Sequence, residues 1–186
     1  MMNEWEEKKA LKRKYTDKLA SVDLERYNLK KIDIRLFSYI RGVQSCPDGH
    51  NLYEVLSVLK FLRLMDAYTF RKKKVKVFVA LYESLKFSGI NGRRSYKLTP
   101  VQYFQFASIL GFYRWEDIGS VEGMTERKKG TKVVNGRVME LRRLVREAIL
   151  FVPRKFSKTT STASLAVNDL LFGDANEIGR ASCRER

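Results

Sequence analysis

The sequence predicts a mixed α/β fold in which a helical N-terminal region is followed by one strand–turn–helix unit. Apolar residues recur at helical spacing in several segments before residue 111. Five consecutive apolar residues, 148–152, stand directly before Pro153 and indicate a buried strand, which we expect to be parallel. Residues 159–172 then return to helical spacing. With 44% hydrophobic and 12% aromatic residues the chain can bury a core, which excludes wholesale disorder, collagen and disulfide scaffolds.

The N-terminal region begins with a charged segment, residues 3–20, whose apolar residues are thinly spaced along one helical face. We expect a helix there that packs lightly on another element or forms an arm. Residues 46–49, Cys-Pro-Asp-Gly, are a turn signal, and His50 behind them is expected to be a helix-entry or surface residue. Residues 52–62 and 78–85 place their leucine, valine and aromatic residues on single faces, which predicts two amphipathic helices.

Glycine and asparagine residues within 89–92 are expected to end the second of these helices. Thr99-Pro100 then supplies a capping residue followed by proline at the first helical position, which predicts a third helix over residues 100–111. Residues 115–136 are rich in glycine and charge and poor in apolar residues, so we expect an exposed loop. Near its end, Asn135-Gly136 between β-branched residues predicts a two-residue hairpin.

The chain is strongly basic. Its 186 residues include 37 lysines and arginines against 21 acidic residues, a formal net charge of +16. Phosphates gain Coulomb energy and release counterions when basic groups approach, so this balance favours nucleic acid over a membrane or an acidic protein as partner. The basic residues gather in four runs, at residues 8–9, 12–14, 71–74 and 127–129.

Several classes of protein and site are excluded by the sequence. It has no apolar stretch of about 18 residues, and its first twenty residues are too charged for a secretory signal, so we expect a cytosolic protein that does not enter a membrane. Cys46, Cys183 and His50 are its only cysteines and histidine, too few for a structural zinc site or a disulfide framework.

The turn between the predicted strand and the last helix is a candidate phosphate site. Residues 152–159, Val-Pro-Arg-Lys-Phe-Ser-Lys-Thr, match the last two positions of the P-loop pattern G-x-x-x-x-G-K-[ST] with Lys158 and Thr159, while Val152 and Ser157 occupy the two glycine positions. A strand before and a helix after would place the amides of residues 157–160 at a helix N-terminus, where anions are favoured. A charged helix start is the alternative interpretation.

A longer stretch resembles a known family. Four segments occur in order: Leu98-Thr-Pro-Val-Gln102, Leu110-Gly-Phe112, a basic loop, and residues 146–160, Arg-Glu-Ala-Ile-Leu-Phe-Val-Pro-Arg-Lys-Phe-Ser-Lys-Thr-Thr. Together they look like the N-terminal part of the large terminase subunit of tailed bacteriophages. The likeness covers residues 75–174. That family has a deviant Walker A of the form V-P-R-K-x-G-K-[ST], from which this chain departs at Ser157.

The resemblance implies a P-loop ATPase that binds ATP and Mg²⁺ and drives double-stranded DNA into a capsid. Lys158 would contact the β and γ phosphates, Thr159 would ligate Mg²⁺, and Ser157 and Thr160 would complete the cradle. Arg154 and Lys155 would add positive charge, and Gln102 would lie near the adenine. By the same resemblance, the partners would be the portal and the small terminase subunit, the complete protein would form homo-oligomers, and its place would be the host cell cytoplasm.

These expectations divide the chain into a helical basic arm or subdomain, 1–70, the start of a terminase-like P-loop ATPase domain, 71–176, and a tail, 177–186, that resembles the translation of a sequencing adapter. The P-loop domain would be incomplete, because no later apolar strand ending in aspartate follows to hold Mg²⁺, so we expect no useful ATP hydrolysis by these residues alone. Two alternatives stay open. One is a non-enzymatic basic helical module that binds nucleic acid, and the other is a P-loop ATPase of helicase type.

Overall fold

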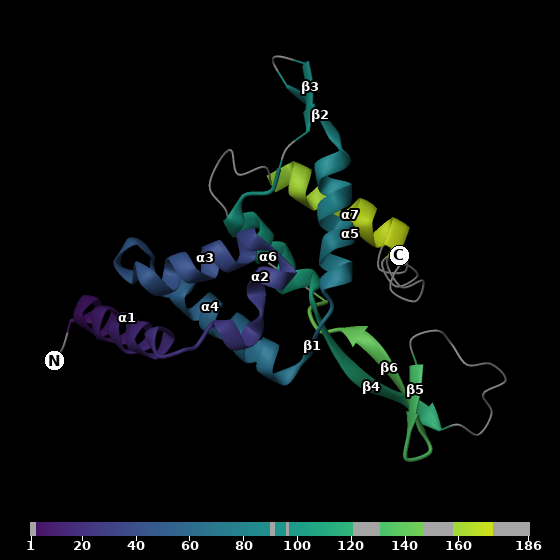
Figure 1. The fold of residues 1–186 in the computed structure, drawn as a ribbon, viewed down its shortest axis with the longest axis horizontal. Helices are drawn as coiled ribbons and strands as arrows, with labels where there is room; N and C mark the ends of the chain where they lie inside the picture. The colour runs from purple at the N-terminus through teal and green to yellow at the C-terminus, as the bar shows by residue number, and fades with distance from the viewer. Residues whose placement is uncertain (1–2, 90–91, 96, 121–130, 147–157, 173–186) are drawn as a thin grey trace. The chain divides into compact units, whose positions relative to one another are not determined.

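The computed structural model of the chain describes residues 3–89, 92–95, 97–120, 131–146 and 158–172 (Figure 1). These residues combine helices with antiparallel strands, so the expectation of a mixed α/β fold is confirmed at that level. The predicted strand 148–152 lies outside the described residues, and so does the turn that follows it. All strand pairs among the described residues are antiparallel.

The chain forms two compact units. The first comprises residues 1–72 and 99–146, and the second comprises residues 73–98 and 147–186. The first unit therefore contains most of the helices and the larger sheet. The division of the sequence into 1–70, 71–176 and 177–186 stays a prediction.

Five α-helices build the first unit: α1 (Glu4–Ala20), α2 (Leu29–Ile32), α3 (Ile34–Ser45), α4 (Leu52–Ala67) and α6 (Pro100–Leu110). Two short 3₁₀ turns, Glu25–Tyr27 and Pro47–Gly49, connect them, and the second confirms the break expected at residues 46–49.

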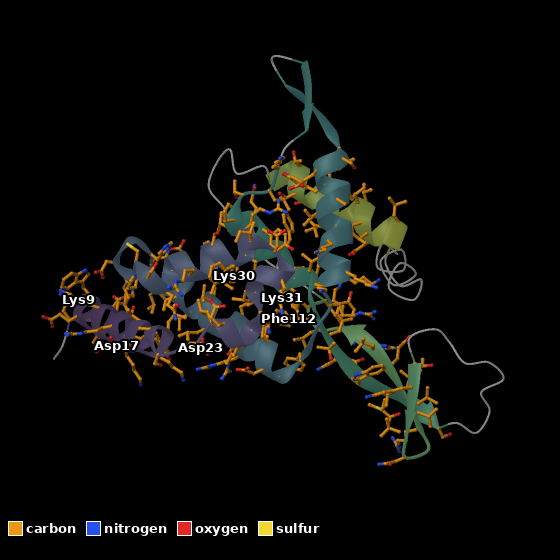
Figure 2. All side chains as sticks on the ribbon, in the orientation of Figure 1. Lys9, Asp17, Asp23, Lys30, Lys31 and Phe112 are labelled. Carbon is orange, nitrogen blue, oxygen red and sulfur yellow. The ribbon has the colours of Figure 1, made fainter. Side chains whose placement is uncertain are left out.

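Helix α1 has the light packing that its sequence predicts. Its N-terminus is closed by a capping box. The Asn3 side chain accepts a hydrogen bond from the backbone N–H of Glu6, and the Glu6 side chain accepts one from the backbone N–H of Asn3. Leu19 is the one residue of this helix that is fully buried, whereas Trp5 is 65% exposed. Lys9 stands over the Trp5 ring near the outer end of the helix (Figure 2). The remaining surface of α1 is charged and open to solvent.

The core of the first unit is an aromatic cluster between α4, α6 and the first strands. Phe61 of α4 packs against the rings of Phe70, Phe104 and Phe112, at centroid distances of 5.9, 5.2 and 5.1 Å. Phe61 and Phe112 are fully buried. Gly111 lies against Phe70 so closely that an added Cβ would come 2.1 Å from the ring, which explains why glycine ends α6.

Four strands form one antiparallel sheet in the order β1-β4-β6-β5, namely β1 (Thr69–Phe70), β4 (Phe112–Ser120), β6 (Arg137–Arg143) and β5 (Thr131–Val134). Strand β4 starts at the aromatic core, where Phe112 lies, and the strands β4, β6 and β5 then leave the helices as a ribbon (Figures 1 and 2). We call these three strands the ribbon. At its start β4 is anchored to β1 by the pairs Thr69–Tyr113 and Phe70–Phe112.

The predicted hairpin at Asn135-Gly136 is confirmed. Both residues have positive φ, 51° and 72°, and they join β5 to β6 with Val134 opposite Arg137. Two consecutive positive φ values define the type I′ turn, whose twist matches that of the flanking strands. The exposed loop expected over residues 115–136 is wrong at its beginning, because residues 112–120 form β4. This strand exposes side chains on both faces and so lacks the apolar alternation by which a half-buried strand is recognised.

The second unit contains α5 (Lys72–Ser84), the two-stranded hairpin β2 (Lys86–Gly89) and β3 (Gly92–Ser95), and α7 (Lys158–Phe172). The buried face of α5 includes Phe78 and Tyr82, as its periodicity predicts. Helix α5 ends at Ser84, so the expectation that the glycines of residues 89–92 end it is wrong; Gly89 and Gly92 instead pair with each other in β2 and β3. Helix α7 agrees with the helix predicted over residues 159–172, and its buried positions include Ser161, Ser164 and Asn168.

Candidate functional site

The predicted phosphate site is described only in its helical part. Helix α7 begins at Lys158, and Thr159 and Thr160 follow in its first turn. The predicted cradle residue Ser157 and the predicted cations Arg154 and Lys155 lie outside the described residues. Lys158 and Thr159 therefore lie in the first turn of a helix, and their assignment to a phosphate site stays a prediction.

Gln102, the predicted adenine neighbour, has a structural role in the first unit. It is the third residue of α6, it is buried, and its Oε1 accepts hydrogen bonds from the N–H and the hydroxyl of Thr99, both at 3.0 Å. Thr99 in turn accepts the backbone N–H of Gln102. This reciprocal capping box confirms the predicted helix start at Thr99-Pro100 and fixes the Gln102 side chain.

Metal and membrane features are absent from the part of the chain that the structure describes. No group of three or more histidine, cysteine, aspartate or glutamate side chains is placed there to bind a metal ion. None of the described helices is both long and apolar enough to cross a bilayer. The assignment of Thr159 as a Mg²⁺ ligand stays a prediction.

His50 precedes the capping residue Asn51 of α4, the helix-entry position expected for it. Its Nδ1 lies 3.4 Å from an Oε atom of Glu54, and its ring meets that of Tyr39 edge to face. Burial, with a smaller contribution from Glu54, raises the pKa of Tyr39 to about 12.

The ribbon concentrates charge on two distinct faces. Residues directly opposite each other in antiparallel strands share a face, and successive residues of one strand alternate between faces. Arg114 and Glu116 of β4 therefore share one face with their partners Arg142 and Glu140 of β6. Arg146, which follows β6, contacts Glu116 from this side, and we call these five residues the glutamate face.

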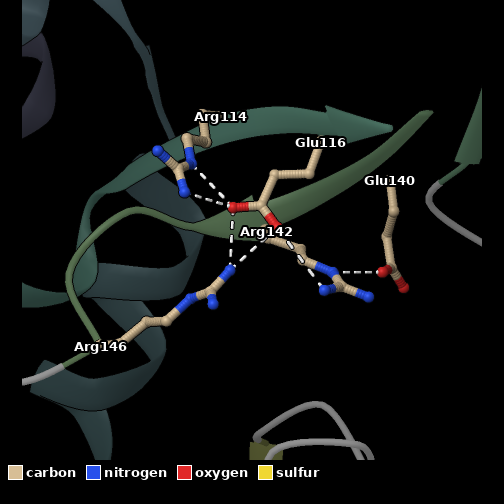
Figure 3. Close-up of polar contacts among 5 residues, drawn as sticks. All are labelled: Arg114, Glu116, Glu140, Arg142 and Arg146. Carbon is tan, nitrogen blue, oxygen red and sulfur yellow. Dashed lines mark hydrogen bonds and ion pairs between the residues drawn. The ribbon is translucent and has the colours of Figure 1, made fainter. Parts of the chain in front are cut away.

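Three arginines of the glutamate face converge on the Glu116 carboxylate (Figure 3). Arg114 donates from Nε to Oε1 at 2.7 Å, and Arg146 donates to both carboxylate oxygens at 2.8 and 2.9 Å. Arg142 lies 3.5 Å from Oε2 of Glu116 and donates from Nε to Glu140 at 2.6 Å. The positive charges of this face are thus engaged with carboxylates of the same face.

The Glu116 carboxylate makes the ribbon sensitive to acid. Burial is the largest single influence and raises the pKa of Glu116, but the hydrogen bonds and charges of Arg114 and Arg146 together bring it below its ordinary value. A group whose pKa is lowered on folding stabilises the folded state above its unfolded pKa, here about 4.3, and this stabilisation is lost as the pH falls through the folded pKa.

We therefore expect the free energy of unfolding of the Glu116→Gln variant to fall below that of the wild type at pH 7 and to approach it below about pH 4. Urea denaturation between pH 3 and 7 measures this difference. The exposed Glu4→Gln variant is the control and should follow the wild type throughout. A difference between wild type and Glu116→Gln that stays constant over the whole range would contradict the role given to the carboxylate.

On the other face of the ribbon, cations lie over aromatic rings. Tyr113, Trp115 and Asp117 occupy every second position of β4 and therefore lie on this face. Arg71 lies over the Tyr113 ring with its Cζ 5.8 Å from the centroid, and Lys132 of β5 lies over the Trp115 ring with its Nζ at 4.2 Å. We call this the aromatic face.

At the outer end of the aromatic face, Arg137 donates to the Asp117 carboxylate and lowers its pKa, aided by the N–H of Gly119. The aromatic face was not predicted from the sequence. The alternation Tyr-x-Trp-x-Asp in residues 113–117 is the signal that could have indicated it, but Arg71 and Lys132 join it only through strand pairing.

Comparison of the chain with protein-family models, with curated proteins and with solved structures finds no match.

Proposed function

We propose that this chain belongs to the large terminase subunit of a tailed phage and contributes the ATP-binding turn of a DNA-packaging motor. One observation supports this most: α7 begins at Lys158, so the motif's lysine and Thr159 enter a helix at its N-terminus. Unpaired amides and the helix dipole favour a phosphate there. The order of Thr99-Pro100, Gln102 and the Pro-Arg-Lys segment before α7 agrees with the family pattern.

In this proposal the chain's own residues position the nucleotide. Lys158 neutralises the β and γ phosphates, Arg154 and Lys155 add positive charge, and Thr159 offers its hydroxyl to Mg²⁺. Gln102, whose Oε1 accepts from Thr99, stays the adenine neighbour that the resemblance implies. Double-stranded DNA is the substrate that is moved. In the same proposal the partners are the portal, the small terminase subunit and further copies of the chain. The protein acts in the host cytoplasm.

A second candidate is a basic module that binds nucleic acid without using ATP. The aromatic face favours it, because exposed cations stand there on neutral rings and are open to a polyanion. The two candidates differ in what they require of the turn at Lys158.

Photolabelling with 8-azido-ATP and Mg²⁺ separates the two candidates. We expect saturable labelling of the peptide that contains Gln102, the adenine neighbour that the resemblance implies, and we expect excess ATP to remove the label. The Gln102→Ala variant should shift or weaken it. Labelling that does not saturate, or that excess ATP leaves unchanged, would reject the ATP-binding proposal and favour the basic module.

A further inference from the structure

We propose that the aromatic face of the ribbon binds the phosphate backbone of double-stranded DNA, with Arg71, Lys132 and Arg137 as the contacting cations. The choice of DNA as the partner rests on the proposed function. The surface itself is argued from the geometry of β4 and its neighbours.

The three cations lie along one strand, although they come from three places: Arg71 follows β1, Lys132 is in β5 and Arg137 is in β6. Each is held by a residue of β4, and the holding residues Tyr113, Trp115 and Asp117 are two positions apart. Two residues of an antiparallel strand span about 6.8 Å. One strand of B-DNA places a phosphate every 3.4 Å or so along its axis, so this interval corresponds to about two nucleotides. The aromatic face therefore distributes positive charge along the length of β4.

The charge on the aromatic face is open to a ligand. Arg71 and Lys132 rest on the rings of Tyr113 and Trp115, which orient a cation without neutralising it. Arg137 is paired with Asp117, yet its side chain is 69% exposed. With Arg143, which lies opposite Tyr113, the face has four cations and one carboxylate, a net charge of 4 − 1 = +3.

The glutamate face offers a contrast on the same strands. Its three arginines and two glutamates leave a net charge of 3 − 2 = +1, and each of the three guanidinium groups has a carboxylate partner. A phosphate would have to displace Glu116 to reach them. The aromatic face is therefore the better phosphate surface, and the glutamate face provides matched control residues.

The rings favour a duplex over a single strand. Proteins that bind single strands use open aromatic rings on which bases stack. Here Lys132 covers the Trp115 ring, and Tyr113 is only 7% exposed beneath Arg71. Trp115 keeps 36% of its surface exposed, and with Lys132 over its ring the face supplies charges for a backbone ahead of an open platform for bases. The ribbon leaves the helices of its unit (Figure 1).

The test compares Lys132→Gln and Arg71→Gln with Arg114→Gln, which removes the same charge from the glutamate face of the same ribbon. Affinity for a fluorescent 20-base-pair duplex is measured by anisotropy between 50 and 300 mM NaCl. Each lost phosphate contact should reduce the slope of log K against log salt by about 0.9, so the double variant Arg71→Gln/Lys132→Gln should lose about 1.8. Arg114→Gln should keep the wild-type slope. Circular dichroism confirms that each variant folds.

Three outcomes would overturn the proposal: an unchanged slope in the double variant, an equal loss in Arg114→Gln, or tighter binding of a 20-nucleotide single strand that disappears in Trp115→Ala. The last would identify a stacking platform instead. ATP labelling of the same variants keeps the two proposals apart, because the labelling should be unaffected by changes to the ribbon. Labelling that fails while the slopes change would reject the ATP site and leave the DNA surface standing.

Discussion

Replacing Lys158 with alanine should abolish ATP turnover by the packaging ATPase to which we assign this chain. The ammonium group would lie against the β and γ phosphates, where it offsets the charge that develops in the transition state. Removing one such group from a preorganised site costs about 100-fold to 1,000-fold in kcat. A coupled assay of phosphate release, with duplex DNA present, measures the effect.

The matched control for Lys158→Ala is Lys76→Ala, which removes an exposed lysine from α5 in the same unit and should leave turnover unchanged. Lys155→Ala should be similarly severe to Lys158→Ala, because the resemblance places a second lysine close to the phosphates, and Arg154→Ala tests the third cation. Ser157→Gly, which restores the glycine of the family pattern, should keep or raise nucleotide affinity. Full turnover by Lys158→Ala would show that the turn is not the phosphate site.

Replacing Phe61 with alanine should destabilise the first unit by about 3–5 kcal/mol. The ring is 1% exposed and contacts Phe70, Phe104 and Phe112, so its removal leaves a cavity between α4, α6 and the start of β4. Urea denaturation followed by circular dichroism measures the change in the free energy of unfolding.

Tyr53→Ala on the same helix is the control for Phe61→Ala. Tyr53 is 73% exposed, and we expect a change within about 0.5 kcal/mol. A loss in Phe61→Ala no larger than that in Tyr53→Ala would contradict the aromatic cluster as the core of this unit. Because the ribbon starts at Phe112, such a result would also question how β4 is anchored.

The sequence predicted those elements whose local chemistry decides the structure. Thr99-Pro100 specifies a helix start by capping and by a fixed proline φ, and Asn135-Gly136 specifies a type I′ turn because asparagine and glycine tolerate positive φ. Helix α7 was predicted from periodicity to within one residue at its start. In each case residues within a few positions of one another contain the whole signal.

Strand β4 could not be predicted in this way. Residues 114–117, Arg-Trp-Glu-Asp, are mostly polar because each face of the ribbon holds its charges in ion pairs or over rings instead of burying them. The partners that stabilise them, Lys132, Arg142 and Arg146 among others, are distant in the sequence. Their convergence depends on the register of β1, β5 and β6, which no local pattern specifies.

The candidate nucleotide residues show the same division. Lys158 was located by a motif and a helix start, both local signals. The capping role of Gln102 could have been predicted from Thr99-x-x-Gln, since a capping box needs glutamine or glutamate at that position. Its proximity to adenine was implied by resemblance and stays a prediction.

The most direct test of the ATP-binding proposal is a calorimetric titration of ATP and Mg²⁺ into the purified 186-residue chain and its Lys158→Ala variant. The account predicts one saturable site in the wild type, weaker binding when EDTA removes Mg²⁺, and no measurable binding by Lys158→Ala, while the Lys76→Ala control binds as the wild type does. Equal affinity of wild type and Lys158→Ala for the nucleotide, or no binding by a folded wild-type chain, would contradict it.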